Sequence, residues 1–381
     1  MKDLNRKKLF KRVNRIVIKV GSGVLTRHNG LDLNVIEDLA GEICSLRRKG
    51  IQVILVSSGA IAAGLRKIGI SKRPDSPSQM QALAAMGQSS LIKVYEEAFA
   101  RHRTQIAQIL LTKDDLTNRQ RFLNARNTLF TLLSWKVVPI INENDTVTAE
   151  EIKFGDNDNL SAMVTNLSGS QLLINLTNID GVYDKDPRTN TDAEKIDVVD
   201  KIDRKIVKAA SSIPGFLGSG GMSSKITAAK QVALSGHPTV IANGRQRGIL
   251  KDIFSGKDVG TLFLPEQSGL SSKKQWIAFT KSPKGEVTID RGAVKALVKK
   301  GKSLLPSGIK SVKGRFSIGD SVLLLGPDGE EVAVGMVNYN STDLARIIGV
   351  NTCEIEGILG CKQDDEVIHR DNLVLKEQLS G

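Results

Sequence analysis

Two clusters of carboxylate and carboxamide side chains lie close together near the middle of the chain. Asn142-Glu143-Asn144-Asp145 follows the apolar run 137–141, and Gly155-Asp156-Asn157-Asp158-Asn159 precedes an apolar stretch that begins at Leu160. Burying such groups without a partner is costly, so the pattern predicts a site for a polar or charged ligand. The alternative is a pair of Asx-rich turns that cap a helix, because Asn and Asp side chains also bond to nearby backbone.

Lys19 is a second unusual feature, because it interrupts the Ile and Val residues of the predicted strand 15–20, and Gly21-Ser22-Gly23 follows that strand at once. A buried lysine needs an anion as its partner. A turn flanked by glycines lets the backbone approach a phosphate closely. The alternative is an edge-strand lysine that reaches solvent.

Two further segments of small residues have the composition of anion sites. Ser57-Ser58-Gly59-Ala60 joins a predicted strand to a predicted helix, where free N–H groups and the helix dipole favour an anion. The loop 218–224 is rich in Gly and Ser, and Lys225 closes it just before a helical pattern that begins at Ile226. We interpret this loop as a phosphate cradle, with a plain flexible linker as the alternative.

The elements that must position these residues alternate in type up to about residue 265. The predicted strands are 15–20, 51–56, 105–111, 137–141, 171–176 and 238–242, and the predicted helices are 34–49, 79–100 and 122–133 with others that begin near 61, 160 and 226. This order predicts an α/β fold, an open and mostly parallel sheet with helices on both faces. Ligands of such sheets bind beyond the carboxyl ends of the strands, where each polar cluster falls.

The composition narrows the class of protein. The chain has 381 residues, of which 40% are hydrophobic and only 4% aromatic, so we expect an aliphatic core in one large or two medium domains. We find neither an apolar run long enough to span a membrane nor a signal-peptide core, and the three cysteines fit neither a metal site nor a disulfide framework. We therefore expect a cytoplasmic protein, with its four scattered histidines in structural or surface roles.

The pattern of apolar runs and turn residues changes after the predicted linker 265–272. We therefore place the domains at 1–265 and 273–376. Short apolar runs at 276–279, 286–289, 322–325 and 332–337, with helices at 291–300 and 342–348, predict a small β-rich domain. Within this domain, residues 273–315 hold twelve Lys or Arg against two acids, and the whole chain carries a net charge of +13. The basic stretch is either a solvated face or a nucleic-acid surface.

At this point the motifs resemble a known family. VIKVGSG, VSSGAIAAG, INENDTV, FGDNDNLSA, LTNIDGVY and GSGGMSSK together resemble the amino-acid kinase superfamily, and in particular its branch that phosphorylates the side-chain carboxylate of L-glutamate. LLPSGIKSVKGRFSIGDSV resembles the PUA domain, an RNA-binding module. The resemblance implies an amino-acid kinase fold with a C-terminal PUA domain. It also implies ATP and L-glutamate as substrates, Mg²⁺ on the nucleotide, RNA as a possible partner, a homo-oligomer and feedback inhibition by proline.

The resemblance also implies roles for particular residues. Lys19 and Lys225 match the lysines that stabilise the transferring phosphoryl group, and Asp158 matches the aspartate that orients them. Ser58, Asp145 and Asn157 match glutamate-binding positions. The ATP site is matched by Lys19, Thr177, Asn178, Ser219, Gly220, Gly221, Met222, Ser223, Ser224 and Lys225. Asn178 stands where the family usually has Asp, which leaves nucleotide contacts at that turn open, and no residue is assigned as a direct ligand of the metal.

The implied chemistry suits these residue types. A carboxylate nucleophile has a pKa of about 4.3 and is ionised at neutral pH, so the reaction needs no general base. The obstacle is the approach of two anions, which two lysines and Mg²⁺ offset by charge neutralisation. The acyl phosphate product hydrolyses readily, so the site must exclude water, and we expect the loop 184–192 or the segment 146–154 to close over it. The rival interpretation is an RNA-binding or regulatory protein with a vestigial kinase domain, against which Lys19, Asp158 and Lys225 argue.

Overall fold

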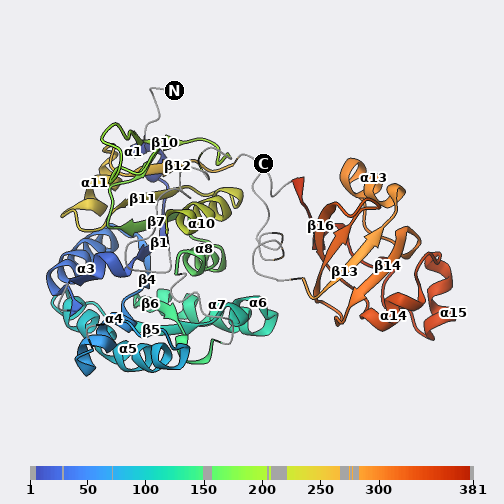
Figure 1. Cartoon of the computed structure of the whole chain (residues 1–381), viewed down its shortest axis with the longest axis horizontal. Coiled ribbons are helices and arrows are strands. Elements are labelled where there is room, and N and C mark those ends of the chain that lie inside the picture. The colour runs from blue at the N-terminus through green and yellow to red at the C-terminus, as the bar shows by residue number, and fades with distance from the viewer. Residues whose placement is uncertain are drawn as a thin grey trace. The chain divides into compact units, whose positions relative to one another are not determined.

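The computed structural model describes residues 6–27, 30–70, 72–148, 157–203, 206, 221–266, 274, 277 and 283–377. The chain divides into two compact units, Met1–Gly269 and Leu270–Gly381, which we describe separately (Figure 1). No helix in the described ranges is long and apolar enough to cross a membrane.

An eight-stranded sheet forms the centre of the first unit, in the order β10-β12-β11-β7-β1-β4-β6-β5. Its strands are β1 (Arg15–Val20), β4 (Gln52–Ser57), β5 (Ile106–Leu111), β6 (Val138–Glu143), β7 (Leu172–Thr177), β10 (Val198–Val199), β11 (Thr239–Asn243) and β12 (Thr261–Phe263). All neighbours pair in parallel except β11 and β12. The prediction of an open, mostly parallel sheet is confirmed, while the short strands β10 and β12 were not predicted because they show too little pattern.

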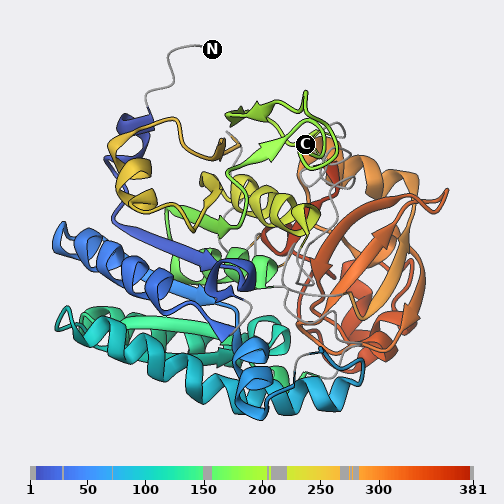
Figure 2. The ribbon, with the colours of Figure 1, turned by 60° about the vertical axis from the view of Figure 1, so that its left-hand side comes forward.

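Helices cover both faces of this sheet, as the two views in Figure 1 and Figure 2 show. They are α1 (Arg6–Phe10), α2 (Ser22–Leu25), α3 (Leu33–Arg48), α4 (Ala60–Ile68), α5 (Pro77–Ala100), α6 (Lys113–Thr117), α7 (Arg119–Ser134), α8 (Asn157–Ser168), α10 (Met222–Leu234) and α11 (Ile249–Ser255). One apolar core lies under α3, α5 and α11, and another lies under α6, α7, α8 and α10. Successive side chains of a strand point to opposite faces, so Ile16 and Ile18 enter the first core and Val17 the second.

Several observed boundaries differ from the predicted ones in ways that matter for the site. Strand β6 continues through Glu143, so Asn142 and Glu143 belong to the strand instead of following it. Helix α8 begins at Asn157, and α10 begins at Met222 with Gly221 as its N-cap. Polar and small residues that the sequence places in loops are therefore first-turn helical residues, a position that favours such side chains because backbone N–H groups remain available there.

Close packing of two helices fixes the turn that carries Ser58. Gly59, at φ 107°, caps the N-terminus of α4, a backbone conformation that favours glycine. A Cβ atom on Gly64 would lie 2.0 Å from the carbonyl oxygen of Leu83, and one on Gly87 would lie 1.8 Å from that of Ala60. The backbones of α4 and α5 therefore touch, and α5 supports the start of α4 directly beside the turn.

The second unit is a five-stranded sheet with helices, in the strand order β14-β13-β15-β16-β17. Its elements are β13 (Gly285–Ile289), α13 (Arg291–Lys300), β14 (Ile309–Gly314), β15 (Ser321–Leu325), β16 (Glu331–Met336), α14 (Ser341–Arg346), α15 (Ile355–Leu359) and β17 (Leu373–Leu375). The β-rich prediction is confirmed, although β14, α15 and β17 were not predicted. Of the strand predicted at 276–279 only Ile277 is described, and its backbone is helical; the other three residues lie outside the described part.

Candidate active site

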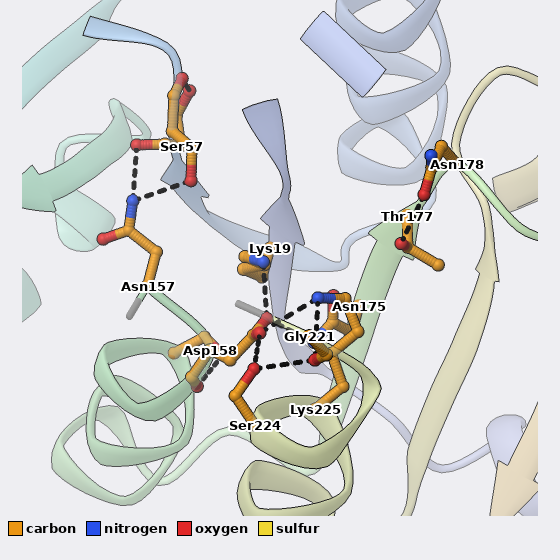
Figure 3. A network of polar contacts seen from close by, with 12 residues as sticks. Lys19, Ser57, Asn157, Asp158, Asn175, Thr177, Asn178, Gly221, Ser224 and Lys225 are labelled. Atoms are coloured by element: carbon orange, nitrogen blue, oxygen red, sulfur yellow. Dashed lines mark hydrogen bonds and ion pairs between the residues drawn. The ribbon is translucent and has the colours of Figure 1, made fainter. Parts of the chain in front are cut away.

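The predicted site residues of the first unit gather at the carboxyl ends of its central strands. Lys19 is the penultimate residue of β1, and Ser58 directly follows β4. Thr177 ends β7, and the first turn of α8 brings Asn157 and Asp158 to the same edge (Figure 3). Parallel strands present all their carboxyl ends at one edge, which explains how residues far apart in sequence meet there.

A buried carboxylate joins the two predicted lysines. Asp158 is fully buried, and Lys19 and Lys225 are only 3% and 6% exposed. Lys19 Nζ donates to Asp158 Oδ1, and Lys225 Nζ donates to Asp158 Oδ2 at 3.1 Å. The edge-strand alternative for Lys19 is wrong, because β1 lies between β7 and β4 and the lysine side chain is buried.

Electrostatics keep Asp158 ionised. Burial by itself would raise the pKa of the Asp158 carboxyl, but the charges of Lys19 and Lys225 and the hydrogen bonds from Lys19 and Ser224 hold that pKa well below its usual range. Two ammonium groups against one carboxylate leave this cluster with a net positive charge. A buried positive cluster at a sheet edge is suited to bind an anion and to stabilise charge that develops on it.

Two further residues complete the hydrogen bonds of this carboxylate. Ser224 Oγ donates to Asp158 Oδ2 at 2.6 Å, and Asn175 Nδ2 donates to Asp158 Oδ1 at 2.9 Å (Figure 3). Ser224 was among the predicted ATP-site residues, but Asn175 was missed. A signal was present in the sequence, because Asn175 is the one amide within the apolar strand LLINLT, much as Lys19 interrupts RIVIKV.

A separate amide network connects two of the predicted glutamate-binding residues. Asn157 Nδ2 donates to Ser58 Oγ at 2.8 Å and to Asn142 Oδ1 at 2.9 Å. Asn142 Nδ2 in turn donates to Gln88 Oε1 on α5 at 2.9 Å. These bonds fix the orientation of the Asn157 amide, whose buried Oδ1 has no hydrogen-bond partner in the described part of the chain. A buried acceptor that lacks a donor among the described residues, such as Asn157 Oδ1, is suited to accept a hydrogen bond from a ligand.

Asp145 lies apart from that network, in the short 3-10 helix Asp145–Val147 after β6. No hydrogen bond joins it to Ser58 or Asn157 across the ranges that the structure describes. Burial raises the pKa of Asp145 to about 6, and the charge of Arg73 offsets only part of this effect. An ionised Asp145 is therefore poorly compensated in the free protein, and a cationic ligand group would stabilise it.

The predicted ATP-site residues lie on β7 and at the start of α10. Thr177 Oγ1 donates to Asn178 Oδ1 at 3.3 Å, and Asn178 is exposed and lies next to Gly23 of the glycine-flanked turn. Gly221, Ser223 and Ser224 present backbone and hydroxyl groups. In contrast, the Met222 side chain packs into a core cluster with Ile226. Ser219 and Gly220 lie outside the described residues, as do 149–154 of the segment expected to close over the site.

Arg245 supports the turn that follows β1. Its guanidinium donates to the carbonyl oxygen of Gly23 at 3.0 Å and to that of Thr26 at 2.5 Å, and it forms an ion pair with Asp32. Asp32 also accepts a hydrogen bond from the backbone N–H of Val35 as the N-cap of α3. The backbone of the Gly21-Ser22-Gly23 turn is thus held from outside the site.

Comparison with known proteins agrees with this geometry. A model of the amino acid kinase family matches residues 14–243, and a model of the PUA domain matches residues 285–359. Together with the parallel sheet and the buried lysine–aspartate–lysine cluster at its carboxyl edge, this match defines the class: the chain belongs to the amino acid kinase family.

Curated relatives match nearly the whole chain. Glutamate 5-kinase of Pelobacter propionicus is 50% identical over 371 residues, which cover 97% of this chain and 100% of the relative. The glutamate 5-kinases of Geobacter sulfurreducens and Geobacter metallireducens are 52% and 54% identical over the same length and coverage. Within the family, the chain therefore belongs to the glutamate 5-kinases, and the resemblance stated from its motifs is confirmed.

The buried cluster generates a prediction about stability. Asp158→Asn removes the negative charge that lies between Lys19 and Lys225, so two buried ammonium groups would lose their counter-ion. We expect the free energy of unfolding to fall by about 3–5 kcal/mol at pH 7, the usual cost of removing one partner of a buried ion pair. Urea unfolding followed by circular dichroism measures the change.

The matched control is Asp192→Asn, which breaks the ion pair between Lys185 and Asp192 on the surface of the same unit. Exposed pairs contribute about 0–1 kcal/mol, so this variant should unfold nearly as the unmodified protein does. Equal unfolding midpoints for the two variants would contradict the role of Asp158 as the counter-ion of the buried lysines.

Proposed function

We propose that this protein transfers the γ-phosphoryl group of ATP to the side-chain carboxylate of L-glutamate. The product is L-glutamyl 5-phosphate, and the reaction is the first step of proline synthesis. The observation that supports this most directly is the buried Lys19–Asp158–Lys225 cluster at the carboxyl edge of the sheet, in a chain about 50% identical to glutamate 5-kinases. The reaction would take place in the cytoplasm, and a homo-oligomer remains a prediction from the resemblance.

In this mechanism the protein supplies position and charge. The glutamate carboxylate is ionised at neutral pH, so no protein group has to remove a proton from it. Lys19 and Lys225 enter from different elements and neutralise the charge that gathers on the transferring phosphoryl group. Asp158 does not touch the reacting atoms in this proposal; it keeps the two ammonium groups apart and in place.

The nucleotide is proposed to bind over Thr177, Asn178 and the first turn of α10, where Gly221, Ser223 and Ser224 offer polar groups beside Lys225. The described residues contain no group of three or more His, Cys, Asp or Glu that could hold a metal ion. We propose that Mg²⁺ arrives bound to the nucleotide phosphates, where it would supply further charge neutralisation. The net positive charge of the lysine cluster fits the same polyanionic ligand.

The test of this function is an assay of ADP release from ATP with and without L-glutamate. We expect release that depends on glutamate, and we expect Lys19→Ala or Lys225→Ala to lower kcat about 100-fold or more, by analogy with the loss of single oxyanion donors. Their KM values should change less, because both lysines act mainly on transition-state charge. If the unmodified protein releases no ADP in response to glutamate, the vestigial-kinase interpretation is correct.

Asp145 is proposed to bind the α-ammonium group of glutamate, which distinguishes the free amino acid from an N-acylated one. Asp145→Asn keeps the shape and removes the charge. A hydrogen bond between charged groups contributes about 1.5–3 kcal/mol, so KM for glutamate should rise roughly 10- to 150-fold. KM for ATP should hardly change, and an equal loss for both substrates would place Asp145 at the nucleotide instead.

The raised pKa of Asp145 gives this assignment a pH dependence. Burial favours the neutral carboxyl, which lacks the charge that the ammonium group needs, so KM for glutamate should rise as pH falls through about 6. The glutamate side chain itself stays ionised over this range, since its pKa is about 4.3. Asp145→Asn should show a KM that is nearly flat from pH 8 to pH 5.5, and a profile parallel to that of the unmodified protein would refute the assignment.

We propose RNA as a second ligand, bound by the second unit. The favouring observation is a set of exposed cations on α13 and on the segment after it, where Arg291, Lys295 and Lys299 recur at one helical spacing. None of these three forms an ion pair with another described residue. Lys302, Lys310 and Arg315 are exposed as well. Such cations attract a polyanion, and all six lie within the residues that the PUA model matches.

Filter binding of RNA to the full chain at two salt concentrations tests this proposal. Affinity should fall steeply with salt, and the triple change Arg291→Glu, Lys295→Glu and Lys299→Glu should weaken binding and reduce the salt slope by about one for each phosphate that the variant no longer neutralises. Lys362→Glu with Lys376→Glu changes charge elsewhere on the same unit and serves as the control. No binding at low salt would favour the solvated-face interpretation.

A further inference from the structure

Asn175 occupies an unusual place in the sheet. It is the fourth residue of β7, a strand whose residues are all buried, and only 1% of its own surface is exposed. Its neighbours across the sheet are Lys19 on β1 and Ile241 on β11. Its Nδ2 is hydrogen-bonded, but its buried Oδ1 has no partner in the described part of the chain. Such an amide in a central strand is costly to bury, so its position directly beside Lys19 calls for a physical reason.

The hydrogen bonds of Asp158 supply that reason. Each carboxylate oxygen accepts from one lysine and one neutral donor: Oδ1 from Lys19 and Asn175, and Oδ2 from Lys225 and Ser224. An ionised carboxylate offers about four acceptor positions, and these four donors occupy them. Neither ammonium group can then turn to bind both oxygens, so the two lysines remain separated, one on each side of the carboxylate.

An amide is the side chain that meets this need without adding charge. A carboxylate at position 175 would cancel the remaining positive charge of the cluster, and a lysine there would add a third buried cation. A leucine would remove one of the two donors to Asp158 Oδ1 and leave Lys19 as the other. The carboxylate could then rotate and accept a second hydrogen bond from the same lysine. Asn175 gives the carboxylate a donor while the cluster keeps the charge that attracts a phosphoryl group.

We infer that Asn175 is a positioning residue for phosphoryl transfer, which holds Asp158 so that Lys19 and Lys225 each bind one of its oxygens and face the transferring group. It acts through Asp158 and the lysines and touches neither substrate. The inference rests on the proposed kinase function.

Steady-state kinetics on the full chain test it. Asn175→Leu removes the donor at similar volume, and we expect kcat to fall about 10- to 100-fold, the usual effect of losing one hydrogen bond to a charged group. KM for glutamate and for ATP should change by less than about threefold, because the binding groups of both substrates remain. An unchanged kcat would overturn the inference, and so would a loss confined to KM.

A second variant separates positioning from simple packing. Asn175→Asp has the shape of Asn, but when ionised it lacks the donor and cancels the net charge, so kcat at pH 8 should fall at least as far as in Asn175→Leu. The introduced carboxyl would lie beside Asp158 on α8 and Lys19 on β1, and the charged and polar groups next to it through Asp158 would be Lys225 and Ser224 on α10. Its protonation at lower pH restores both a donor and the original charge. The ratio of its kcat to that of the unmodified protein should therefore rise as pH falls from 8 to 5.5, and a constant ratio would contradict the inference.

Thr239→Val is the matched control. Thr239 is 1% exposed on the adjacent strand β11, and its hydroxyl has no hydrogen-bond partner in the described part of the chain. Replacing it also changes a buried polar group of the same sheet, away from Asp158, and should leave kcat within about twofold. Glutamate-dependent ADP release by the unmodified protein is measured in parallel, so that an inactive protein would refute the proposed function and active Asn175 variants would refute only this inference.

Discussion

The arrangement of this site depends on one buried carboxylate. Placing Asp158 in the protein interior is unfavourable on its own, and two lysines beside each other would be unfavourable as well. Together they compensate, because each lysine lies on a different oxygen and two neutral donors complete the set. The result is a buried centre with excess positive charge that is held in place before any ligand arrives, which is the condition under which electrostatic stabilisation of a transition state is most effective.

The parallel sheet makes this centre possible. Lys19 and Asn175 are partners in neighbouring strands, and their side chains point to the face that α8 and α10 cover. Those two helices pack on each other and begin at the carboxyl edge, so their first turns bring Asp158, Ser224 and Lys225 to the same place. Polar residues replace apolar ones at this end of β1 and β7, while Ile16, Val17 and Ile18 remain in the cores.

The features of this site that could be predicted are those that appear as an unusual residue within a short stretch of sequence. A lysine inside an apolar strand is anomalous for burial, so Lys19 could be selected with the layered fold alone in mind. The cluster 155–159 could be selected in the same way, but Asp158 was distinguished within it only by the family resemblance. The sequence signal for Asn175 is weaker, because an amide in a strand has several ordinary explanations and its partner Asp158 is seventeen positions away. The hydrogen bond from Asn142 to Gln88, which supports Asn157 through Asn142, could not be predicted, since it depends on where α5 lies relative to the end of β6. Short strands such as β10, β12 and β17 could not be predicted either, because their pairing is decided by tertiary contacts.

The two aspartates of the site differ in a way that separates their proposed roles. Asp158 has its pKa lowered by cations that belong to the protein, so its contribution to stability is present at neutral pH and is lost as pH falls through that low pKa. Asp145 has its pKa raised to about 6 by burial, so the folded chain holds a proton there more tightly than the unfolded chain does. The stability that this proton contributes is present at low pH and is lost as pH rises through about 6. One carboxylate is therefore satisfied within the fold, and the other, which Arg73 stabilises only in part, is stabilised further when a cationic ligand group arrives. A permanent counter-ion for the lysines and a receptor for a substrate ammonium group call for these two opposite environments, because the first must not change during turnover and the second must favour the bound state.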